Sequence, residues 1–215
     1  MEPTTRERGC VTVTIDSSAA RDQPDVSVPE RFIQAATRLF AEQDFPTTSV
    51  QEIVNAVGLT KGAFYHYFSS KDDLLHEIYA RLLRLQQEHL DVIMGLELPP
   101  DERLRRVAVD VVTTTLENLD AARVFFRSYH LLPDDKRVAI RASRREYGET
   151  LARLIEEGIS AGVLSADAMP ADIRLYHFIG AVSWATIWYQ PGGAYGVSDI
   201  ANWYAHDLLD SLRPR

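Results

Sequence analysis

Hydrophobic residues recur at helical spacing along most of the chain, beginning after a polar stretch of 26 residues. In the first helical segment, apolar side chains stand at positions i, i+3, i+4, i+7 and i+8, namely Phe32, Ala35, Ala36, Leu39 and Phe40. Ser27, Pro29 and Glu30 precede them as a cap, a first-turn proline and a capping-box acid. We therefore expect a helix that starts at Ser27.

Residues 1–26 are polar and contain scattered Thr, Ser, Asp and Pro, so we expect a mostly disordered tail. The VTVTI run at residues 11–15 alternates like a strand, but no second strand is available to pair with it. Arg6, Arg8 and Arg21 could add phosphate contacts, although an inert tail is the simpler interpretation.

The stretch from Thr47 to Lys71 predicts two short helices joined by a glycine turn. Ser49 and Glu52 have capping-box spacing, and Gly58 suits a tight turn because glycine readily adopts left-handed backbone angles. Thr60 can cap the second helix. The first helix has one apolar stripe, formed by Val50, Ile53, Val54 and Val57.

The second short helix is expected to turn Ala63, Phe64 and Tyr67 inward. Its outward face then consists of small or polar residues, namely Lys61, Gly62, Tyr65 and His66. A glycine-joined helix pair with such an outer face suits insertion into a DNA major groove. The alternative is an ordinary helical hairpin whose polar residues are merely solvated.

The rest of the chain also reads as helical, with about nine helices in all and no convincing strand, so the predicted fold class is all-α. After a helix from Lys71 to Met94, the later helices are expected near residues 101–117, 121–132, 133–161, 170–189 and 198–212, the last capped by Ser198. We expect a tail at 1–26, a three-helix, helix-turn-helix DNA-binding domain at 27–75, and a larger helical ligand-binding and dimerisation domain at 76–215.

Aromatic residues are concentrated in the second half, where they suit the walls of a pocket for a largely apolar effector. The candidates are Phe125, Phe126, Tyr129, His130, Tyr176, His177, Trp184 and Trp188. A plain aromatic core is the competing interpretation for each of them. The helices at 173–189 and 198–212 have more apolar surface than one core needs, which predicts an isologous four-helix interface in a homodimer.

Composition limits the other classes of function. The chain has 215 residues, 46% hydrophobic content, one cysteine (Cys10) and no apolar run of membrane-spanning length, which together predict a soluble cytoplasmic protein. Its net charge is −8, unusual for a DNA binder, and residues 1–75 contribute 7 basic minus 11 acidic side chains, or −4. However, residues 57–70 contain Lys61 and no acid, so the local balance still permits phosphate contacts.

An enzyme is not indicated. The six histidines are scattered without a His-x-x-x-His pair, so neither a metal site nor a cofactor is predicted. The sequence also lacks a Gly-x-Ser-x-Gly elbow and a phosphate-binding lysine loop.

Three segments resemble the N-terminal domain of the TetR family of bacterial transcriptional regulators. They are LFAEQDFPTTSV, VGLTKGAFYHYF and SSKDDLL, within an ungapped match from about Arg31 to Tyr79. The segment WATIWYQPGGAYGVSDIANWY is similar to TetR-type repressors of fatty-acid and steroid catabolism, which bind acyl-CoA or other lipid-like effectors. That similarity makes Arg141, Arg144 and Arg145 candidates for contacting a phosphorylated carrier, whereas their helical spacing alone predicts an exposed basic stripe.

The resemblance implies a homodimeric repressor that binds double-stranded DNA at an inverted repeat and leaves it when a small effector binds. Thr48 and Ser49 would meet phosphate, and Thr60, Lys61, Gly62 and Ala63 would enter the groove. Tyr65, His66 and Lys71 would contact the backbone or base edges. The rival hypothesis is a helical cytoplasmic ligand-binding or scaffold protein that does not touch DNA.

Overall fold

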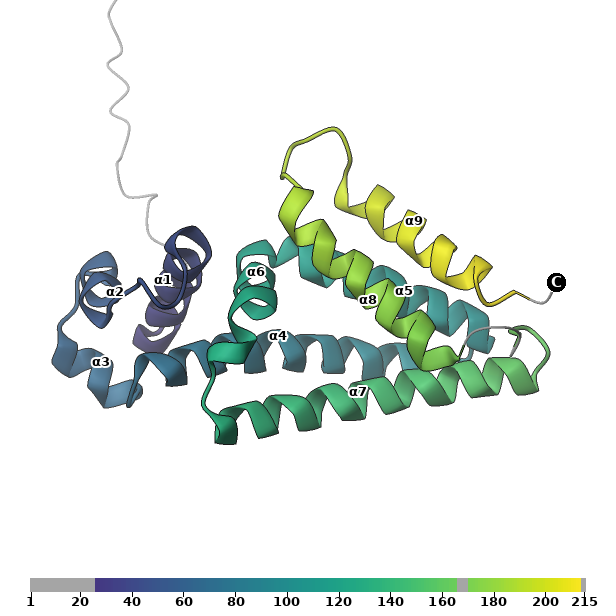
Figure 1. Cartoon of the computed structure of the whole chain (residues 1–215), viewed down its shortest axis with the longest axis horizontal. Coiled ribbons are helices and arrows are strands. Elements are labelled where there is room, and N and C mark those ends of the chain that lie inside the picture. Colours follow the sequence, from purple (N-terminus) through teal and green to yellow (C-terminus); the bar gives the residue numbers. More distant parts are fainter. Residues whose placement is uncertain (1–25, 166–169, 214–215) are drawn as a thin grey trace, which may run out of the picture.

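The computed structural model describes residues 26–165 and 170–213, and within these ranges all regular structure is helical. The all-α prediction is therefore confirmed (Figure 1). The described helices are α1 (Val28–Gln43), α2 (Val50–Val57), α3 (Lys61–Tyr67), α4 (Lys71–Met94), α5 (Pro100–Glu117), α6 (Leu119–Ser128), the 3₁₀ turn η1 (Tyr129–Leu131), α7 (Asp134–Ser160), α8 (Ala171–Trp188) and α9 (Val197–Asp210). The VTVTI run and the arginines at positions 6, 8 and 21 lie outside the described residues.

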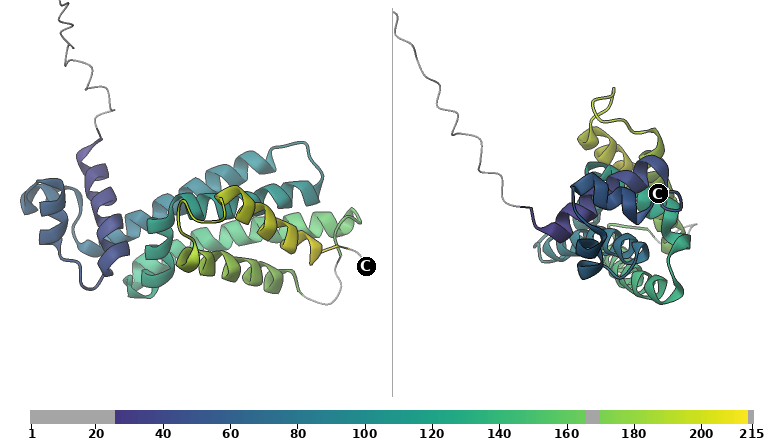
Figure 2. Two further views of the ribbon diagram at one scale, coloured as in Figure 1. Left: turned by 90° about the horizontal axis from the view of Figure 1, so that it is seen from above. Right: turned by 90° about the vertical axis from the view of Figure 1, so that its left-hand side faces the viewer.

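A small head formed by α1, α2 and α3 lies at one end of an elongated molecule (Figure 1). Helix α4 leaves the head and runs into the larger body, where α7 lies along it. Helices α8 and α9 pack on the side of α5. The end-on view in Figure 2 shows the head in front of the body helices. This arrangement connects the two halves through one continuous helix.

Two hydrophobic cores stabilise these halves. In the head, Phe32 packs edge-on against Phe64 and Phe68, with ring centroids 5.5 and 6.3 Å apart. The same core continues into α6. There the carbonyl oxygen of Val124 accepts a hydrogen bond of 2.9 Å from the hydroxyl of Tyr79 on α4. The second core fills the body between α5, α7, α8 and α9. Because the head core extends into α6, the head and the body share buried surface.

The local signals of the two short helices are present in the structure. The Ser49 hydroxyl accepts from the amide of Glu52 at 3.2 Å, and the Glu52 carboxylate accepts from the amide of Ser49 at 2.7 Å. Gly58 has a φ of 68°, in the left-handed region, and the Thr60 hydroxyl accepts from the amide of Ala63 at 3.2 Å. These short-range contacts set the angle at which α3 follows α2.

Other helix ends differ from the sequence prediction. Ser27 stands at the cap of α1, but its side chain makes no capping bond there. Helix α9 starts after Gly196 and not at Ser198, because the Asp199 carboxylate accepts from the amide of Gly196 at 3.2 Å. The helix expected at 121–132 is α6 followed by η1, so the chain tightens before Pro133.

Ion pairs connect the body to the head and to the start of α4. Arg127 on α6 pairs with Asp44, which follows α1 with a φ of 70°, and also donates to the carbonyl oxygen of Ala41 at 3.4 Å. Lys136 on α7 pairs with Asp73 in the first turn of α4. The Arg127 pair lies at the loop between α1 and α2, and the Lys136 pair lies in the first turn of α4, just after α3.

Candidate DNA-binding surface and ligand cavity

Helix α3 presents a polar surface at the end of the head. Lys61, Gly62, Tyr65 and His66 are exposed, whereas Ala63 is half-buried. Ser49 and Thr60 are exposed at the caps of α2 and α3. A short helix with an open N-terminus and exposed donors has the form needed to enter a major groove.

Tyr67 was assigned to the inner stripe, and this is wrong. It is 46% exposed and its ring lies edge-on to that of His66, with centroids 4.7 Å apart. Phe68 takes the inner position because the backbone is extended after α3, which turns the Phe68 ring toward Phe32 and Phe64. Tyr67 therefore adds a fourth donor side chain to the exposed face, one that helical spacing alone assigned to the core.

Two residues predicted to meet DNA use their side chains for hydrogen bonds within the protein. Thr48 is buried, and its hydroxyl donates to the carbonyl oxygen of Asp44 at 2.8 Å. The Lys71 ammonium donates to the carbonyl oxygens of Phe45 at 2.6 Å and Thr48 at 2.8 Å, and lies 4.3 Å from the centre of the Phe45 ring. Burial lowers the pKa of Lys71. Both side chains hold the loop between α1 and α2, so their effect on DNA would be indirect.

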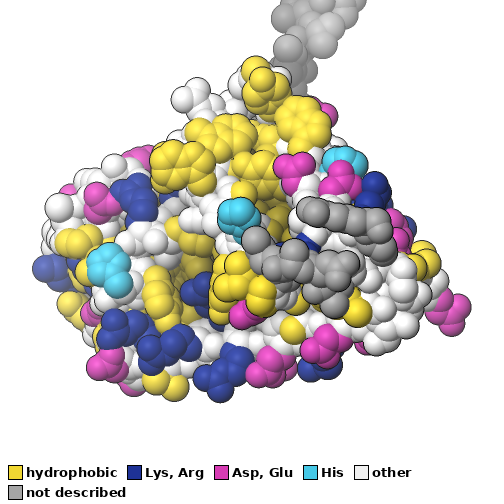
Figure 3. All heavy atoms as spheres, turned by 45° about the vertical axis from the view of Figure 1, so that its right-hand side comes forward, with side chains coloured by type: hydrophobic (Ala, Val, Ile, Leu, Met, Phe, Trp, Pro, Cys, Tyr) yellow, Lys and Arg dark blue, Asp and Glu magenta, His cyan; other side chains and the backbone are white. Residues whose placement is uncertain are grey.

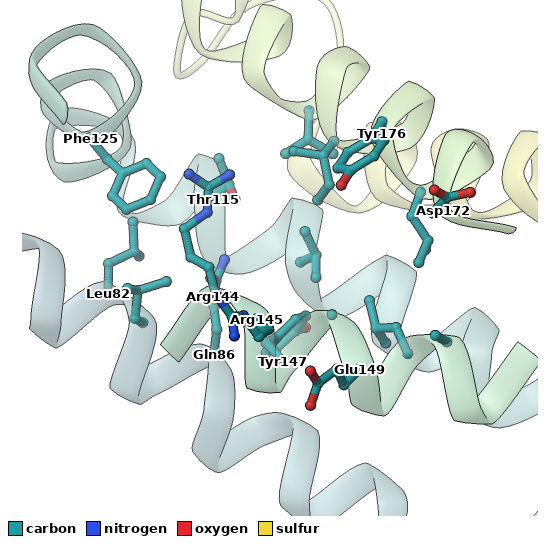
Figure 4. Close-up of a pocket in the computed structure, with 18 of the residues that line it drawn as sticks. Leu82, Gln86, Thr115, Phe125, Arg144, Arg145, Tyr147, Glu149, Asp172 and Tyr176 are labelled. Atoms are coloured by element: carbon teal, nitrogen blue, oxygen red, sulfur yellow. The ribbon is translucent and has the colours of Figure 1, made fainter. Parts of the chain in front are cut away.

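The body contains a cavity of about 390 Å³ between α4, α5, α6, α7 and α8 (Figure 4). Four of the predicted effector residues line it, namely Phe125, Phe126, Arg144 and Tyr176. Most of the other walls are aliphatic, formed by Leu82, Leu83, Val111, Leu151, Ala152, Leu175, Ile179 and Val182. This size and lining are typical of a site for a small, largely apolar molecule.

Arg144 brings a positive charge into this apolar space. Its guanidinium carbon lies 5.5 Å from the ring centre of Phe125 and 5.8 Å from that of Tyr129. Tyr129 is therefore behind the arginine and does not line the cavity. Arg145 lines the cavity as well, as do the carboxylates of Glu149 and Asp172 (Figure 4). An anionic ligand group would be attracted to the Arg144 side.

Four predicted effector residues are elsewhere: His130, His177, Trp184 and Trp188 do not line the cavity. Trp184 is 62% exposed and Trp188 is 40% exposed, and both histidines are exposed. Helix α8 is apolar nearly all round, so its sequence did not reveal which side faces inward. The polar cavity residues Gln86, Thr115 and Tyr147 were missed because each has polar or charged neighbours along its helix, so nothing local distinguishes it from a solvated position.

The sequence of this chain matches two known family descriptions. Residues 97–212 match the family described as "Tetracyclin repressor-like, C-terminal domain", and residues 32–78 match "Bacterial regulatory proteins, tetR family". The chain belongs to the TetR family. It is thus a transcriptional regulator with an N-terminal helix-turn-helix domain, as the sequence predicted.

TetR-family relatives match over most of the chain. The HTH-type transcriptional repressor KstR2 of Rhodococcus jostii is 28% identical over 189 residues, covering 84% of this chain and 88% of the relative. The transcriptional regulator AcuR of Cereibacter sphaeroides is 33% identical over 178 residues, covering 74% and 76% respectively.

Solved structures of TetR-family regulators share the fold. The ketosteroid regulator KstR2 of Mycobacterium tuberculosis superposes with a TM-score of 0.80 at 19% identity, covering 88% of this chain and 96% of that one. AibR, solved in complex with isovaleryl coenzyme A and operator DNA, has a TM-score of 0.73 at 22% identity, covering 86% and 98%.

One polar cluster in this TetR-family chain lies between α4 and α5, outside the cavity lining. The Asp110 carboxylate on α5 is 2.7 Å from Nδ1 of His89 on α4 and 3.4 Å from the Thr114 hydroxyl. Burial raises the pKa of Asp110, although His89 opposes that shift.

The described residues contain no group of three or more His, Cys, Asp or Glu arranged to hold a metal ion. Nor does any helix in the described ranges have the length and hydropathy to cross a membrane.

Proposed function

We propose that this chain is a homodimeric repressor that binds an inverted-repeat operator through α2 and α3 and dissociates when a largely apolar ligand enters the body cavity. The observation that carries this proposal is the position of α6. Phe125 and Phe126 of this helix line the cavity, and Arg127, the next residue, pairs with Asp44 in the head. A ligand that displaces the two phenylalanines would therefore also move the contact that holds the head.

The exposed face of α3 supports the DNA-binding half of the proposal. Lys61 is placed to meet phosphate, Gly62 and Ala63 allow the helix backbone to approach the bases, and Tyr65 and His66 can reach base edges or sugars. Ser49 and Thr60 lie at helix N-termini, where backbone amides favour phosphate groups. Because such a regulator works on the bacterial chromosome, we infer a cytoplasmic location.

The cavity supports an amphipathic, anionic ligand, and an acyl-CoA thioester is the class we favour. Its acyl chain would occupy the aliphatic walls, while Arg144 and Arg145 would face its polar part. AibR, a fold relative, was solved with isovaleryl coenzyme A and operator DNA together, which supports the same class here. The occupied dimer must differ from the free dimer in operator affinity, typically by 1–3 kcal/mol of coupling free energy.

The dimer interface that we propose is the outer face of α8 and α9. Hydrophobic side chains gather there, above an edge of lysine and arginine side chains (Figure 3). Of the exposed hydrophobic residues on α8, on α9 and in the loop between them, we assign Ile173, Trp184, Ile187, Trp188, Tyr195 and Trp203 to this outer α8–α9 face, whereas Tyr176 lines the cavity. Gly180 also lies on this face, and a Cβ built there would meet nothing within 4 Å, so the protomer itself does not require a glycine. Large exposed apolar patches of this kind mark interaction sites.

The DNA-binding half can be tested with fluorescein-labelled DNA from the chain's own promoter region. Fluorescence anisotropy should give a linear fall of log affinity with log salt, because several phosphate contacts release counterions. Lys61→Ala should weaken binding several-fold and flatten that slope, with no loss of thermal stability, since the side chain is exposed. If Lys61→Ala binds the operator as tightly as the wild type, Lys61 is not part of the DNA interface. Failure of the wild-type chain to bind any promoter fragment would favour the helical ligand-binding or scaffold alternative.

The ligand half can be tested by adding decanoyl-CoA to the protein–operator complex. We expect operator release from the wild type and a weaker response from Arg144→Gln. The matched control is Arg141→Gln, because Arg141 is an exposed arginine on the same helix that does not line the cavity. Equal loss in both variants would indicate general charge neutralisation, and the assignment of Arg144 to the ligand site would then be wrong.

A further inference from the structure

Three buried side-chain oxygen atoms have no hydrogen-bond partner among the described residues. They are the hydroxyls of Tyr129 and Tyr147 and Oδ2 of Asp110, and of these three residues only Tyr147 lines the cavity. Native proteins leave very few buried polar atoms unpaired, because such an atom has given up its hydration and received nothing in exchange. Because Tyr147 lines the cavity, its unpaired hydroxyl indicates a polar partner that enters the cavity from outside the chain.

The surroundings of Asp110 leave one oxygen of its carboxylate open. Oδ1 accepts contacts from His89 Nδ1 and the Thr114 hydroxyl, which hold the carboxylate in one orientation. Val111, the next residue on α5, lines the cavity. Asp110 itself does not line the cavity, so its buried Oδ2 is not offered to a ligand there.

Tyr147 forms part of the cavity wall on the α7 side, between Arg145 and Glu149 (Figure 4). Burial, and then the nearby charge of Asp110, raise the pKa of its phenol, so the hydroxyl retains its proton and can donate it. No hydrogen bond joins Tyr147 to Asp110, so the Tyr147 hydroxyl still lacks an acceptor.

We propose that Tyr147 is a hydrogen-bonding subsite of the cavity and binds a hydroxyl or carbonyl oxygen on the ligand's apolar framework. The inference rests on the proposed ligand site and adds to it the chemistry of the ligand's interior. The Tyr147 hydroxyl would donate to the ligand oxygen, and both a hydroxyl and a carbonyl oxygen can accept that bond.

The subsite is about one helical turn along α7 from Arg144, since the two residues are three positions apart. The ligand would therefore have its anionic group near Arg144 and an oxygen substituent part of the way along the apolar framework. A purely aliphatic ligand would leave the Tyr147 hydroxyl unpaired, and a buried group left in that state discriminates strongly against such ligands.

The probes are decanoate and its 3-hydroxy, 5-hydroxy and 10-hydroxy derivatives, whose binding to the full chain is measured by isothermal titration calorimetry. At least one hydroxy isomer should bind the wild type about tenfold more tightly than decanoate, which corresponds to about 1.4 kcal/mol. Tyr147→Phe should reduce that preference to less than twofold while leaving decanoate affinity and melting temperature unchanged or slightly increased.

Tyr129→Phe is the matched control, because it removes another buried, unpartnered hydroxyl that does not line the cavity. It should keep the preference for the hydroxy isomer. If every isomer binds no better than decanoate, or if the preference survives in Tyr147→Phe, water alone fills the space and the subsite is wrong. If neither decanoate nor any isomer binds at millimolar concentration, the cavity is not a site for such ligands, and the ligand half of the proposed function fails with the subsite.

Discussion

The protomer does not explain the glycine at position 62. A Cβ at this position would approach only the Thr60 hydroxyl, at 3.6 Å, which is an ordinary contact. Glycine within a helix is less stable than alanine by about 0.5–1 kcal/mol. Because the fold would accept alanine, the reason for glycine lies outside the chain, and close approach to DNA supplies one.

Gly62→Ala should therefore separate stability from binding. We expect the free energy of unfolding in urea to rise by about 0.5 kcal/mol, whereas operator affinity in the anisotropy assay should fall at least tenfold. Gly58→Ala is the control, since its φ of 68° strains any side chain. That variant should lose about 1 kcal/mol of stability. Normal operator affinity in Gly62→Ala would argue against the placement of α3 in the groove.

Lys61 and Lys71 show how far single residues could be assigned from the sequence. Both are lysines at the start of a helix, and both were predicted to meet DNA. Lys61 is exposed, but the fold brings the carbonyl oxygens of Phe45 and Thr48 to the Lys71 ammonium from more than twenty residues away. Contacts at that sequence distance leave no local signal, whereas the Ser49 and Thr60 caps act over three residues and could be predicted.

At the scale of whole elements, the sequence revealed helix positions better than helix faces. The amphipathic stripes of α1 and α2 correctly placed Phe32, Ile53 and Val54 in the core. Helix α8 has no such stripe, so Trp184 and Trp188 were assigned to a pocket although both are exposed. The cavity itself forms where five helices meet, and no single helix sequence contains that information.

The ion pair between α4 and α7 gives a prediction for the joint between head and body. Burial alone would raise the pKa of Asp73, but Lys136 and Ser69 lower it to about 2, below the usual value of 3.8. A carboxylate with a lowered folded-state pKa stabilises the protein above the unfolded-state pKa, and this stabilisation is lost as pH falls towards 2.

Lys136→Met should thus reduce the free energy of unfolding by about 1–2 kcal/mol at pH 7. By pH 3 the difference from the wild type should shrink to about half, because Asp73 is then largely protonated in the unfolded chain. Urea unfolding at both pH values measures it. Arg137→Met, which removes an exposed pair with Asp134 on the same helix, should cost much less. A difference that is independent of pH would mean that Lys136 acts through packing and not through Asp73.

At the scale of the whole molecule, the outer α8–α9 face decides whether one chain or two read the operator. A single head offers one short recognition helix, whereas two heads related by a twofold axis can read half-sites about 34–36 Å apart. The exposed tryptophans and Gly180 lie on a face that the protomer leaves uncovered, and a symmetry mate would bury it. We therefore expect dimerisation to depend on apolar side chains that the protomer's own stability does not need.

Trp184→Glu tests this directly, because Trp184 is 62% exposed and the protomer should fold without it. Sedimentation equilibrium at micromolar concentration should show a dimer for the wild type and a monomer for the variant, since a carboxylate buried at the interface would be unpaired. Val92→Glu provides the control, as Val92 on α4 is 69% exposed but lies outside the outer α8–α9 face. Val92→Glu should remain dimeric.

The monomeric Trp184→Glu variant should keep its helical circular dichroism and lose most of its operator affinity, because each head would then bind a half-site alone. A dimeric Trp184→Glu chain would place the interface elsewhere.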